Sequence, residues 1–466
     1  MFKSPSSKLL YSFFFSFFIH SVINGQALDS VFRVDSIYIS GNNKTKTKII
    51  LREISFKLGD TIHNWSYHKE QSRKQLINLY IFNEVSVEKD GGLVTIHVTE
   101  RWYIWPIPQL DYADRNFNQW WLSKDFNRLI YGVNLEWYNI RGRNETMTLR
   151  LLSGYTKMAA IKYKIPYFNK KQTWGLQVDA HYSTNREVWY KTEEDKVQFF
   201  RDNDKILLTR KNAELTLTHR KKIFSYHNIF SGIRQTNIAD TVATYEVNRR
   251  YLLNNQNSQT ELYLGYHYIY DRRDFKGFPL KGNLLKLNIE LSQFNLPSKN
   301  LHTLSLKGSY SKYFPIFRKL YGSFHGTLRY YSNDYPPYSK IQALGYGKDY
   351  IRGYELNVID GNNFALGKAE IKYQILDKKY KFLPKLRNYE VLPISVYLSS
   401  FYDLGYVQNA YEKTTLYSNN ILPNSLQRGG GVGINFVMFY DYCTRIEYAA
   451  DKFLNRRFYI SFVASM

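Results

Sequence analysis

From Trp102 to the C-terminus, apolar and polar residues alternate with a period of two, and no helical spacing interrupts this pattern. In one segment, Leu285 and Leu287 alternate with Lys286 and Asn288. Successive side chains of a β-strand point to opposite faces, so each such segment has one apolar and one polar face. The pattern predicts a mainly β, antiparallel fold. Segments that show it include Met147–Leu151, Trp174–Tyr182, Leu285–Leu291, Ala369–Ile375 and Phe458–Phe462.

Two kinds of β protein alternate in this way. A soluble sandwich buries the apolar faces between two sheets, whereas a transmembrane barrel turns them toward lipid. Alternation alone does not separate the two, but the aromatic content favours the barrel. The chain has 42 Tyr and 30 Phe residues, and membrane barrels collect aromatic residues in girdles at the membrane surface. We therefore predict a barrel of about sixteen tilted strands over residues 102–466.

The N-terminus has the pattern of a secretory signal peptide. Lys3 and Lys8 precede an apolar run, Leu9–Ile23, and small or polar residues follow near Gly25. The run is too short for a spanning helix, and nothing downstream offers about eighteen consecutive apolar residues. We expect residues 1–25 to be a signal peptide. The mature chain is then exported and enters a membrane only as a barrel.

Residues 26–101 predict a small α+β domain that precedes the barrel. Apolar residues there change from alternation to helical spacing and back, with Ser66 as a helix cap and Gly91 in a hairpin turn. The expected elements are a strand, two helices and a hairpin of two strands: Val31–Ser40, Thr47–Phe56, Ser66–Tyr80, Asn83–Lys89 and Leu93–Arg101.

Several motifs resemble one known family. The stretch Ile39–Asp60 (ISGNNKTKTKIILREISFKLGD) resembles the start of a POTRA domain. Tyr350–Tyr354 (YIRGY) resembles the Arg-Gly motif in the sixth extracellular loop of the bacterial surface antigen superfamily, the BamA/TamA-like outer-membrane assembly proteins. Arg428–Gly433 (RGGGVG), followed by Arg445 and Glu447, resembles the penultimate strands of these barrels. The resemblance implies an outer-membrane barrel with a single POTRA domain.

A further motif, Tyr270–Gly282 (YDRRDFKGFPLKG), resembles the Asp-x-Arg-Asp…Pro…Gly hairpin of the same superfamily. The residues that carry this resemblance are Asp271, Arg273, Asp274, Pro279 and Gly282.

In this superfamily the loop arginine folds into the lumen and pairs with acidic residues of two neighbouring strands. The resemblance therefore implies that Arg352, with Gly353 and Tyr354, is locked against Glu370 and Asp403. Strand parity is compatible with this arrangement, since both acids alternate with apolar residues and should face the lumen. The alternative is that these acids are ordinary hydrated charges of the lumen. A bidentate arginine–carboxylate contact would fix one position of the loop.

The first barrel strand, near Trp105–Tyr112, contains Pro106 and Pro108. Residues two apart direct their amides to the same edge, and proline has no amide hydrogen to donate. We therefore expect a short, weak seam with the last strand, at Phe458, Ile460 and Phe462. In BamA-like proteins such a seam is the proposed lateral gate, where client strands pair by β-augmentation.

These features predict an outer-membrane protein assembly, insertion or translocation factor, in which the POTRA domain captures extended clients and the seam admits them. The alternatives are a polypeptide or lipid transporter that uses the lumen, as in two-partner secretion, and a purely structural barrel. Expected partners are unfolded outer-membrane protein clients, outer-membrane lipids and accessory lipoproteins. The expected location is the outer membrane of a Gram-negative bacterium, with the POTRA domain in the periplasm.

The net charge of +24 raises the question of a nucleic-acid partner. No basic helix or clustered basic patch supports one, and a barrel can direct its cations to lipid headgroups or to a hydrated lumen. Cys443 is the single cysteine, so no internal disulfide forms. There is no Gly-x-Ser-x-Gly motif or phosphate-binding loop, and no histidines beyond His63 and His68 have metal-ligand spacing. We expect no enzyme activity, metal or cofactor.

Overall fold

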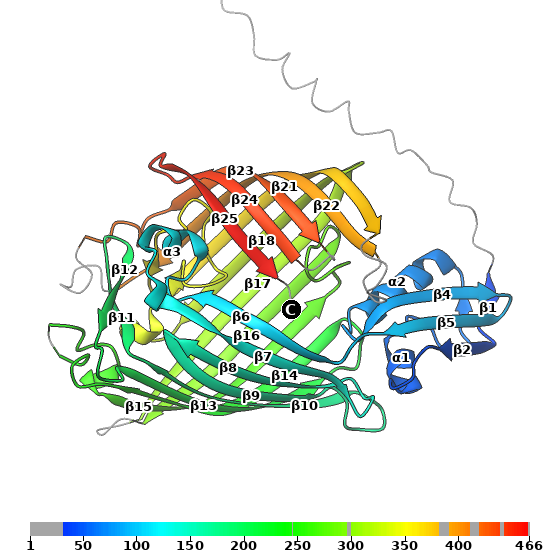
Figure 1. Ribbon diagram of the computed structural model, residues 1–466, viewed down its shortest axis with the longest axis horizontal. Coiled ribbons are helices and arrows are strands. Elements are labelled where there is room, and N and C mark those ends of the chain that lie inside the picture. The colour runs from blue at the N-terminus through cyan, green and yellow to red at the C-terminus, as the bar shows by residue number, and fades with distance from the viewer. Residues whose placement is uncertain are drawn as a thin grey trace, which may run out of the picture.

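The computed structural model describes residues 31–244, 246–295, 300–381, 391–410, 419–438 and 442–464. The predicted signal peptide lies outside the described residues. An α+β N-terminal domain is followed by a large curved sheet, and the domain lies at one end of the barrel that this sheet forms (Figure 1). We call this end of the barrel the near end and the opposite end the far end.

The N-terminal domain has a three-stranded sheet in the order β2-β5-β4, with β2 parallel to β5 and β4 antiparallel to it. A short pair, β1 with β3, completes it. Apolar side chains of the sheet and both helices form one core, which includes Val34, Ile50, Leu76 and Ile96. Its elements are β1 (Phe32–Arg33), β2 (Ser36–Ser40), α1 (Thr47–Glu53), β3 (Thr61–Ile62), α2 (Trp65–Ile77), β4 (Phe82–Asp90) and β5 (Leu93–Glu100).

The sequence predicted the order of the main elements of this domain but missed three details. The first strand is interrupted after Arg33, where buried Val34 leaves the strand to enter the core. The short strand β3 was not predicted. Helix α2 is capped by Asn64, not by Ser66: the Asn64 side chain accepts a 2.9 Å hydrogen bond from the amide of Tyr67. Asparagine at this position satisfies an amide that the helix itself leaves unpaired.

Sixteen strands form the second sheet, and each is antiparallel to its neighbours. The sheet curls into a barrel (Figure 1), and its two end strands are β6 and β25. Its strands are β6 (Ile104–Tyr112), β7 (Leu129–Ile140), β8 (Glu145–Gly154), β9 (Thr156–Ile165), β10 (Trp174–Asn185), β13 (Leu208–His219), β14 (Ser225–Ile238), β15 (Ser258–Asp271), β16 (Gly282–Asn295), β17 (Leu301–Phe317), β18 (Leu320–Tyr331), β21 (Asn363–Lys381), β22 (Val391–Gln408), β23 (Gln427–Met438), β24 (Tyr442–Ala450) and β25 (Arg456–Ala464).

The apolar face of this sheet points outward. On β16, Leu287 and Leu291 are 41% and 55% exposed, and on β21 the exposed residue Ile371 precedes the buried Lys372. A soluble sandwich would bury these apolar side chains, whereas a membrane barrel presents them to lipid. Among the described residues, no helix has the length and apolar character needed to cross a bilayer.

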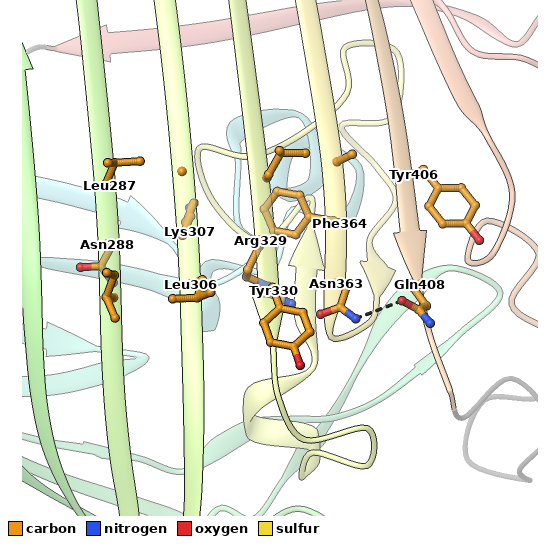
Figure 2. Close-up of a pocket in the computed structure, with 14 residues that line it drawn as sticks. Leu287, Asn288, Leu306, Lys307, Arg329, Tyr330, Asn363, Phe364, Tyr406 and Gln408 are labelled. Carbon is orange, nitrogen blue, oxygen red and sulfur yellow. Dashed lines mark hydrogen bonds between the residues drawn. The ribbon is translucent and has the colours of Figure 1, made fainter.

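A depression of about 500 Å³ interrupts the outer face over β16, β17, β18, β21 and β22 (Figure 2). It lies where small residues, Gly308 and Ala365, stand in a cross-strand row between the large side chains of Leu287, Leu328 and Tyr406. The depression therefore follows from side-chain size in the wall.

The long connections at the far end contain further short elements. They are α3 (Phe117–Ser123) and η1 (Phe126–Arg128) between β6 and β7, the hairpin β11 (Glu187–Glu193) with β12 (Lys196–Arg201), η2 (Leu253–Asn255), η3 (Tyr338–Lys340), and the pair β19 (Gln342–Leu344) with β20 (Ile359–Asp360). None of these elements was predicted.

Candidate functional site

The connection between β18 and β21, residues 332–362, brings Arg352 against the inner wall of the barrel. The Arg352 guanidinium donates two hydrogen bonds to Asp403 on β22, from Nε (2.9 Å) and from Nη2 (2.7 Å). The backbone amide of Arg352 donates a third, at 3.0 Å. Arg352 is 3% exposed and Asp403 is fully buried. Two parallel bonds of this kind fix both the direction and the position of the arginine side chain.

Two further carboxylates face the same guanidinium. Arg352 Nη1 lies 3.6 Å from Glu370 on β21 and 3.7 Å from Glu447 on β24. The guanidinium also lies over the ring of Phe401, 3.8 Å from its centroid. The structure thus brings Arg352 together with both predicted acids, with Asp403 as the direct partner. Glu447 was not predicted as a partner, although it alternates with the outward-facing Ile446 and Tyr448 and so faces the lumen.

Glycines allow the loop to approach the wall closely. Gly353 has a φ of +97°, which favours glycine. A side chain at Gly429 on β23 would place its Cβ 1.9 Å from the carbonyl oxygen of Arg352. Gly429 belongs to the predicted RGGGVG motif, so this part of the motif makes room for the loop.

Two tyrosines tie the loop to the last strands. The Tyr354 hydroxyl donates to the side chain of Gln427 (3.1 Å) and accepts from the amide of Lys452 (3.1 Å). Tyr459 on β25 donates its hydroxyl hydrogen to the carbonyl oxygen of Gly353 at 3.1 Å. The loop therefore contacts β25 directly, next to the seam.

Glu355 of this loop forms no ion pair with a cationic side chain among the described residues. One carboxylate oxygen accepts from the amide of Gly353 at 2.9 Å, and the other is buried with no hydrogen bond. Burial raises the pKa of Glu355 to about 8. Glu355 is thus protonated at neutral pH, which removes the cost of a buried charge.

The motif Asp271–Gly282 forms the near-end turn between β15 and β16. Arg273 donates two hydrogen bonds to Asp271 (2.9 and 2.7 Å), and Asp274 accepts from the amide of Leu280 (3.1 Å). Gly282 has a φ of +101° where the strand begins, and Pro279 lies within the turn and is partly buried.

This turn reaches across the lumen. It carries Phe278 to the inner surface of strands four or more positions from β16, where Phe278 packs with Tyr397, Val437 and Cys443. The ring of Phe278 lies 4.9 Å from that of Tyr397. The motif therefore places an aromatic side chain across the near end of the barrel.

The two end strands of the sheet are not paired with each other in the described part of the chain. Pro106 and Pro108 lie within the continuous β6–β7 register. Because proline has no N–H to donate to β7, the nitrogens of both residues must face the opposite edge of β6, which is the seam. On the other side of the seam, Phe458 and Phe462 are 73% and 65% exposed. Ile460 lies between them.

Helix α3 occupies this edge of β25. The side-chain amide of Asn118 donates to the carbonyl oxygen of Ile460 (3.1 Å), and its oxygen accepts from the Ile460 amide (2.9 Å). The rings of Phe117 and Phe462 meet edge to face, 5.9 Å apart. No sequence signal had indicated this contact.

The N-terminal domain is docked on near-end turns of the barrel. Glu53 of α1 forms a buried ion pair with Arg220, which follows β13, and accepts a 2.7 Å hydrogen bond from the Tyr167 hydroxyl. Burial favours the neutral carboxyl, but Arg220 outweighs it and keeps the pKa of Glu53 below its ordinary value of 4.5. Arg52 adds a 2.8 Å hydrogen bond to the carbonyl oxygen of Arg220.

A second docking contact involves the turn between β7 and β8. The amide of Lys46 donates to the carbonyl oxygen of Gly142 at 2.9 Å. Asn139 donates to the Thr45 hydroxyl at 2.8 Å. Gly142 has a φ of +67°, and a Cβ there would lie 2.0 Å from the carbonyl oxygen of Lys44. The two domains thus meet through several specific contacts.

The connections at the far end bind one another. Asp195, at the tip of the β11–β12 hairpin, accepts hydrogen bonds from the amides of Ile421 and Leu422, both 3.2 Å. Its carbonyl oxygen accepts from the amide of Val358 at 2.8 Å. Three connections therefore join over this end. Among the described residues, no group of three or more His, Cys, Asp or Glu side chains could hold a metal ion.

Comparison with known proteins identifies the family. The profile of the Omp85 superfamily domain matches residues 139–438. The chain belongs to the Omp85 superfamily. A second profile, a POTRA domain described as a surface antigen variable number repeat, matches residues 32–101. The N-terminal domain is therefore a POTRA domain, and the superfamily consists of assembly or transport factors of the Gram-negative outer membrane that act on unfolded client proteins.

Solved structures share the fold at low sequence identity. BamA from Haemophilus ducreyi lacking POTRA domains 1–3 has a TM-score of 0.53 and 14% identity, over 92% of this chain and 84% of that one. CdiB from Acinetobacter baumannii has a TM-score of 0.48 and 11% identity, over 93% and 73% of the two chains. No curated protein sequence matches this Omp85 chain. The similarity to the BamA structure supports the assignment of the barrel fold.

Proposed function

We propose that this Omp85 protein inserts extended client polypeptides into the outer membrane through the seam between β6 and β25. The observation that carries the proposal is the absence of pairing between these two strands in the described part of the sheet. An unpaired edge presents a row of backbone donors and acceptors, and an extended client can add to it as a further strand. Pro106 and Pro108 remove two amide donors from the free edge of β6. Strand β6 should therefore pair only weakly with β25 and leave the edge of β25 open to a client strand.

The lumen offers a poorer route. Phe278 crosses its near end, the Arg352 loop is fixed to its inner wall, and the Asp195 contacts join loops over its far end. A client that passed through the lumen would have to displace all three. Transport of a polypeptide or lipid through the lumen, and a purely structural barrel, are the alternatives to this proposal.

The POTRA domain is placed to receive clients before they reach the seam. Its sheet has two outer strands, β2 and β4, to which an extended peptide can add. In this proposal the domain lies in the periplasm, the outer apolar face contacts outer-membrane lipids, and accessory lipoproteins deliver or hold clients. The role is non-enzymatic, because the work consists of strand pairing and transfer to lipid.

A seam cross-link tests the route. Leu110 on β6 and Phe458 on β25 both point outward, 64% and 73% exposed. With Leu110→Cys and Phe458→Cys in a Cys443→Ser background, bismaleimides that bridge the two strands should block insertion of a radiolabelled barrel client into vesicles that contain the protein. The matched control is Val133→Cys with Leu151→Cys, a pair already joined across β7 and β8. Cross-linking of this control pair should leave insertion unchanged.

Unchanged insertion with a closed seam, together with full cross-linking on gels, would contradict the seam route. Depletion in the parent bacterium then separates the alternatives. Broad loss of outer-membrane barrels indicates a general insertase, loss of one exported protein indicates a dedicated transporter, and no change indicates a structural role.

A further inference from the structure

Helix α3 links the first barrel strand to the edge of the last one. It follows β6 after a short turn, and it packs on β25 on the far side of the unpaired seam (Figure 1). The helix therefore bridges the gap that strand pairing leaves open.

The contact of Asn118 with β25 imitates a strand partner. In an antiparallel ladder, a residue that does not bond to one neighbour directs both its amide and its carbonyl to the other side. Ile460 directs both groups to Asn118, at 2.9 and 3.1 Å. A carboxamide carries an acceptor oxygen and a donor N–H that point in the same direction, so one side chain can bond the amide and the carbonyl of a single strand residue. One side chain thus occupies the pairing position of an incoming strand.

Helix α3 is held weakly. It has seven residues, and none of them is buried. Trp121 and Leu122 are 56% and 64% exposed. Isolated helices of this length are unstable in water, so α3 depends on its few tertiary contacts. Loss of those contacts should release it easily.

The base of α3 is tied to the locked loop. Arg115 donates to the carbonyl oxygens of Gly345 (2.6 Å) and Asn357 (3.0 Å). Asn116 donates to the carbonyl oxygen of Glu355 (2.7 Å), while its side-chain oxygen caps α3 through the amide of Gln119 (2.9 Å). The same loop segment that carries Arg352 therefore positions the helix.

We propose that α3 is a displaceable latch on β25, in which Asn118 occupies the strand-pairing site at Ile460 until an extended client strand replaces it. The partner is an amphipathic β-strand with free backbone groups, since only such a strand satisfies Ile460 and continues along the edge past Phe458 and Phe462. The identity of the client rests on the proposed function. The contact of Asn118 with the edge of β25 does not depend on that function.

The first test measures the latch without a client. Hydrogen exchange of the full chain in phosphatidylcholine vesicles should be faster at the amide of Ile460 in Asn118→Ala than in the parent protein. Phe117→Ala, which removes the ring contact with Phe462, should act in the same direction. The matched control is Asn127→Ala, because Asn127 lies in the same connection and its exposed side chain donates to Asp125 within that connection. Exchange at Ile460 that is equal in all four proteins overturns the latch.

The second test measures displacement. The probe is a synthetic, fluorescently labelled peptide with the sequence of β16, residues 282–295, which alternates like a barrel strand. Its affinity should rise about tenfold in Asn118→Ala, because the peptide no longer competes with two hydrogen bonds. The same peptide with Leu287→Pro and Glu290→Pro lacks an amide donor on each of its two edges and should not bind. Equal affinity for parent and Asn118→Ala overturns displacement.

The two proposals fail separately. If Asn118→Ala exposes Ile460 and strengthens peptide binding while the seam cross-link leaves client insertion unchanged, the latch stands and the proposed route of insertion is wrong.

Discussion

Glu53 and Arg220 form a buried ion pair that joins the POTRA domain to the barrel, although 167 residues separate them in the chain. Tyr167 donates to the same carboxylate from another turn. The orientation of the POTRA domain is therefore fixed by charged groups that water does not screen, and it should respond to substitution and to pH.

Glu53→Gln should release the POTRA domain from the barrel, because it leaves the Arg220 guanidinium buried without its charge partner. Breaking such a pair costs about 3–5 kcal/mol. Distances between spin labels on the POTRA domain and on the barrel should broaden in the variant. Glu70→Gln is the control, since Glu70 pairs with Arg73 on the exposed surface of α2 and such pairs contribute about 0–1 kcal/mol. A distance distribution that is the same in Glu53→Gln and the parent would refute the role of the pair.

The same docking should weaken in acid. The pKa of Glu53 is lowered in the folded protein, so the ion pair stabilises docking above the ordinary carboxyl pKa of 4.5. This contribution is lost as pH falls through the lowered value, where the carboxylate is protonated. Spin-label distances recorded down a pH series should broaden below about pH 4.5 in the parent and stay broad at all pH values in Glu53→Gln.

The Arg352 loop should respond to pH in the opposite direction. Burial raises the pKa of Glu355 to about 8. Its contribution to loop docking is therefore fully present below the ordinary carboxyl pKa of 4.5 and is lost as pH rises from there through about 8, where the docked carboxyl ionises. Protease cleavage within residues 345–357 should accelerate as pH rises from 4.5 to about 8 and then level off. Glu355→Gln, which stays neutral, should abolish this dependence. Cleavage that accelerates equally in the variant would assign the effect to another group.

Arg352→Ala should undock the loop and leave the barrel intact. The substitution removes both guanidinium bonds to Asp403 and leaves that buried carboxylate with only Lys368, 3.8 Å away, as a cation among the described residues. The cost to loop docking should approach roughly 3–5 kcal/mol, the cost of a broken buried ion pair. The protein should reach the membrane with a protease-sensitive loop and reduced activity. Arg352→Lys should restore only part of the protection, since an ammonium lacks the planar fork. A double-mutant cycle with Asp403→Ala that gives no coupling would identify the pair as ordinary lumen charges.

The barrel should be heat-modifiable. Its backbone groups pair within the sheet, so the unheated protein in detergent should keep its shape and migrate faster on a gel than the boiled protein. Identical migration before and after boiling, combined with extraction from membranes by carbonate, would exclude a membrane barrel.

The fold could be predicted from the sequence because period-two alternation reports strands independently of their neighbours. Parity also placed Glu370 and Asp403 on the inner face, and the Arg-Gly-Tyr motif directed attention to Arg352. The same parity argument would have found Glu447. What alternation cannot report is which distant segments meet. The pairs Glu53–Arg220 and Asn118–Ile460 join residues 167 and 342 positions apart, and no local pattern marks them.

Helix α3 escaped prediction for a different reason. Its seven residues, FNQWWLS, are too few to show helical periodicity, and neighbouring aromatic residues are equally frequent in strands. Its N-cap, Asn116, is of a residue type that favours helix starts, but Asn and Asp residues are frequent throughout the connections. Asn116 therefore did not single out this helix.

The docking of the POTRA domain sets limits on how this protein can vary. Near-end turns of a barrel usually tolerate changes in length, because they are short, exposed connections. Here Gly142 and Arg220 belong to turns that also contact the POTRA domain. One inserted residue in either turn would displace these contacts by about the length of one residue, roughly 3 Å. Related chains should therefore conserve the lengths of these two turns, while the β17–β18 turn at Arg318 is free to grow or shrink.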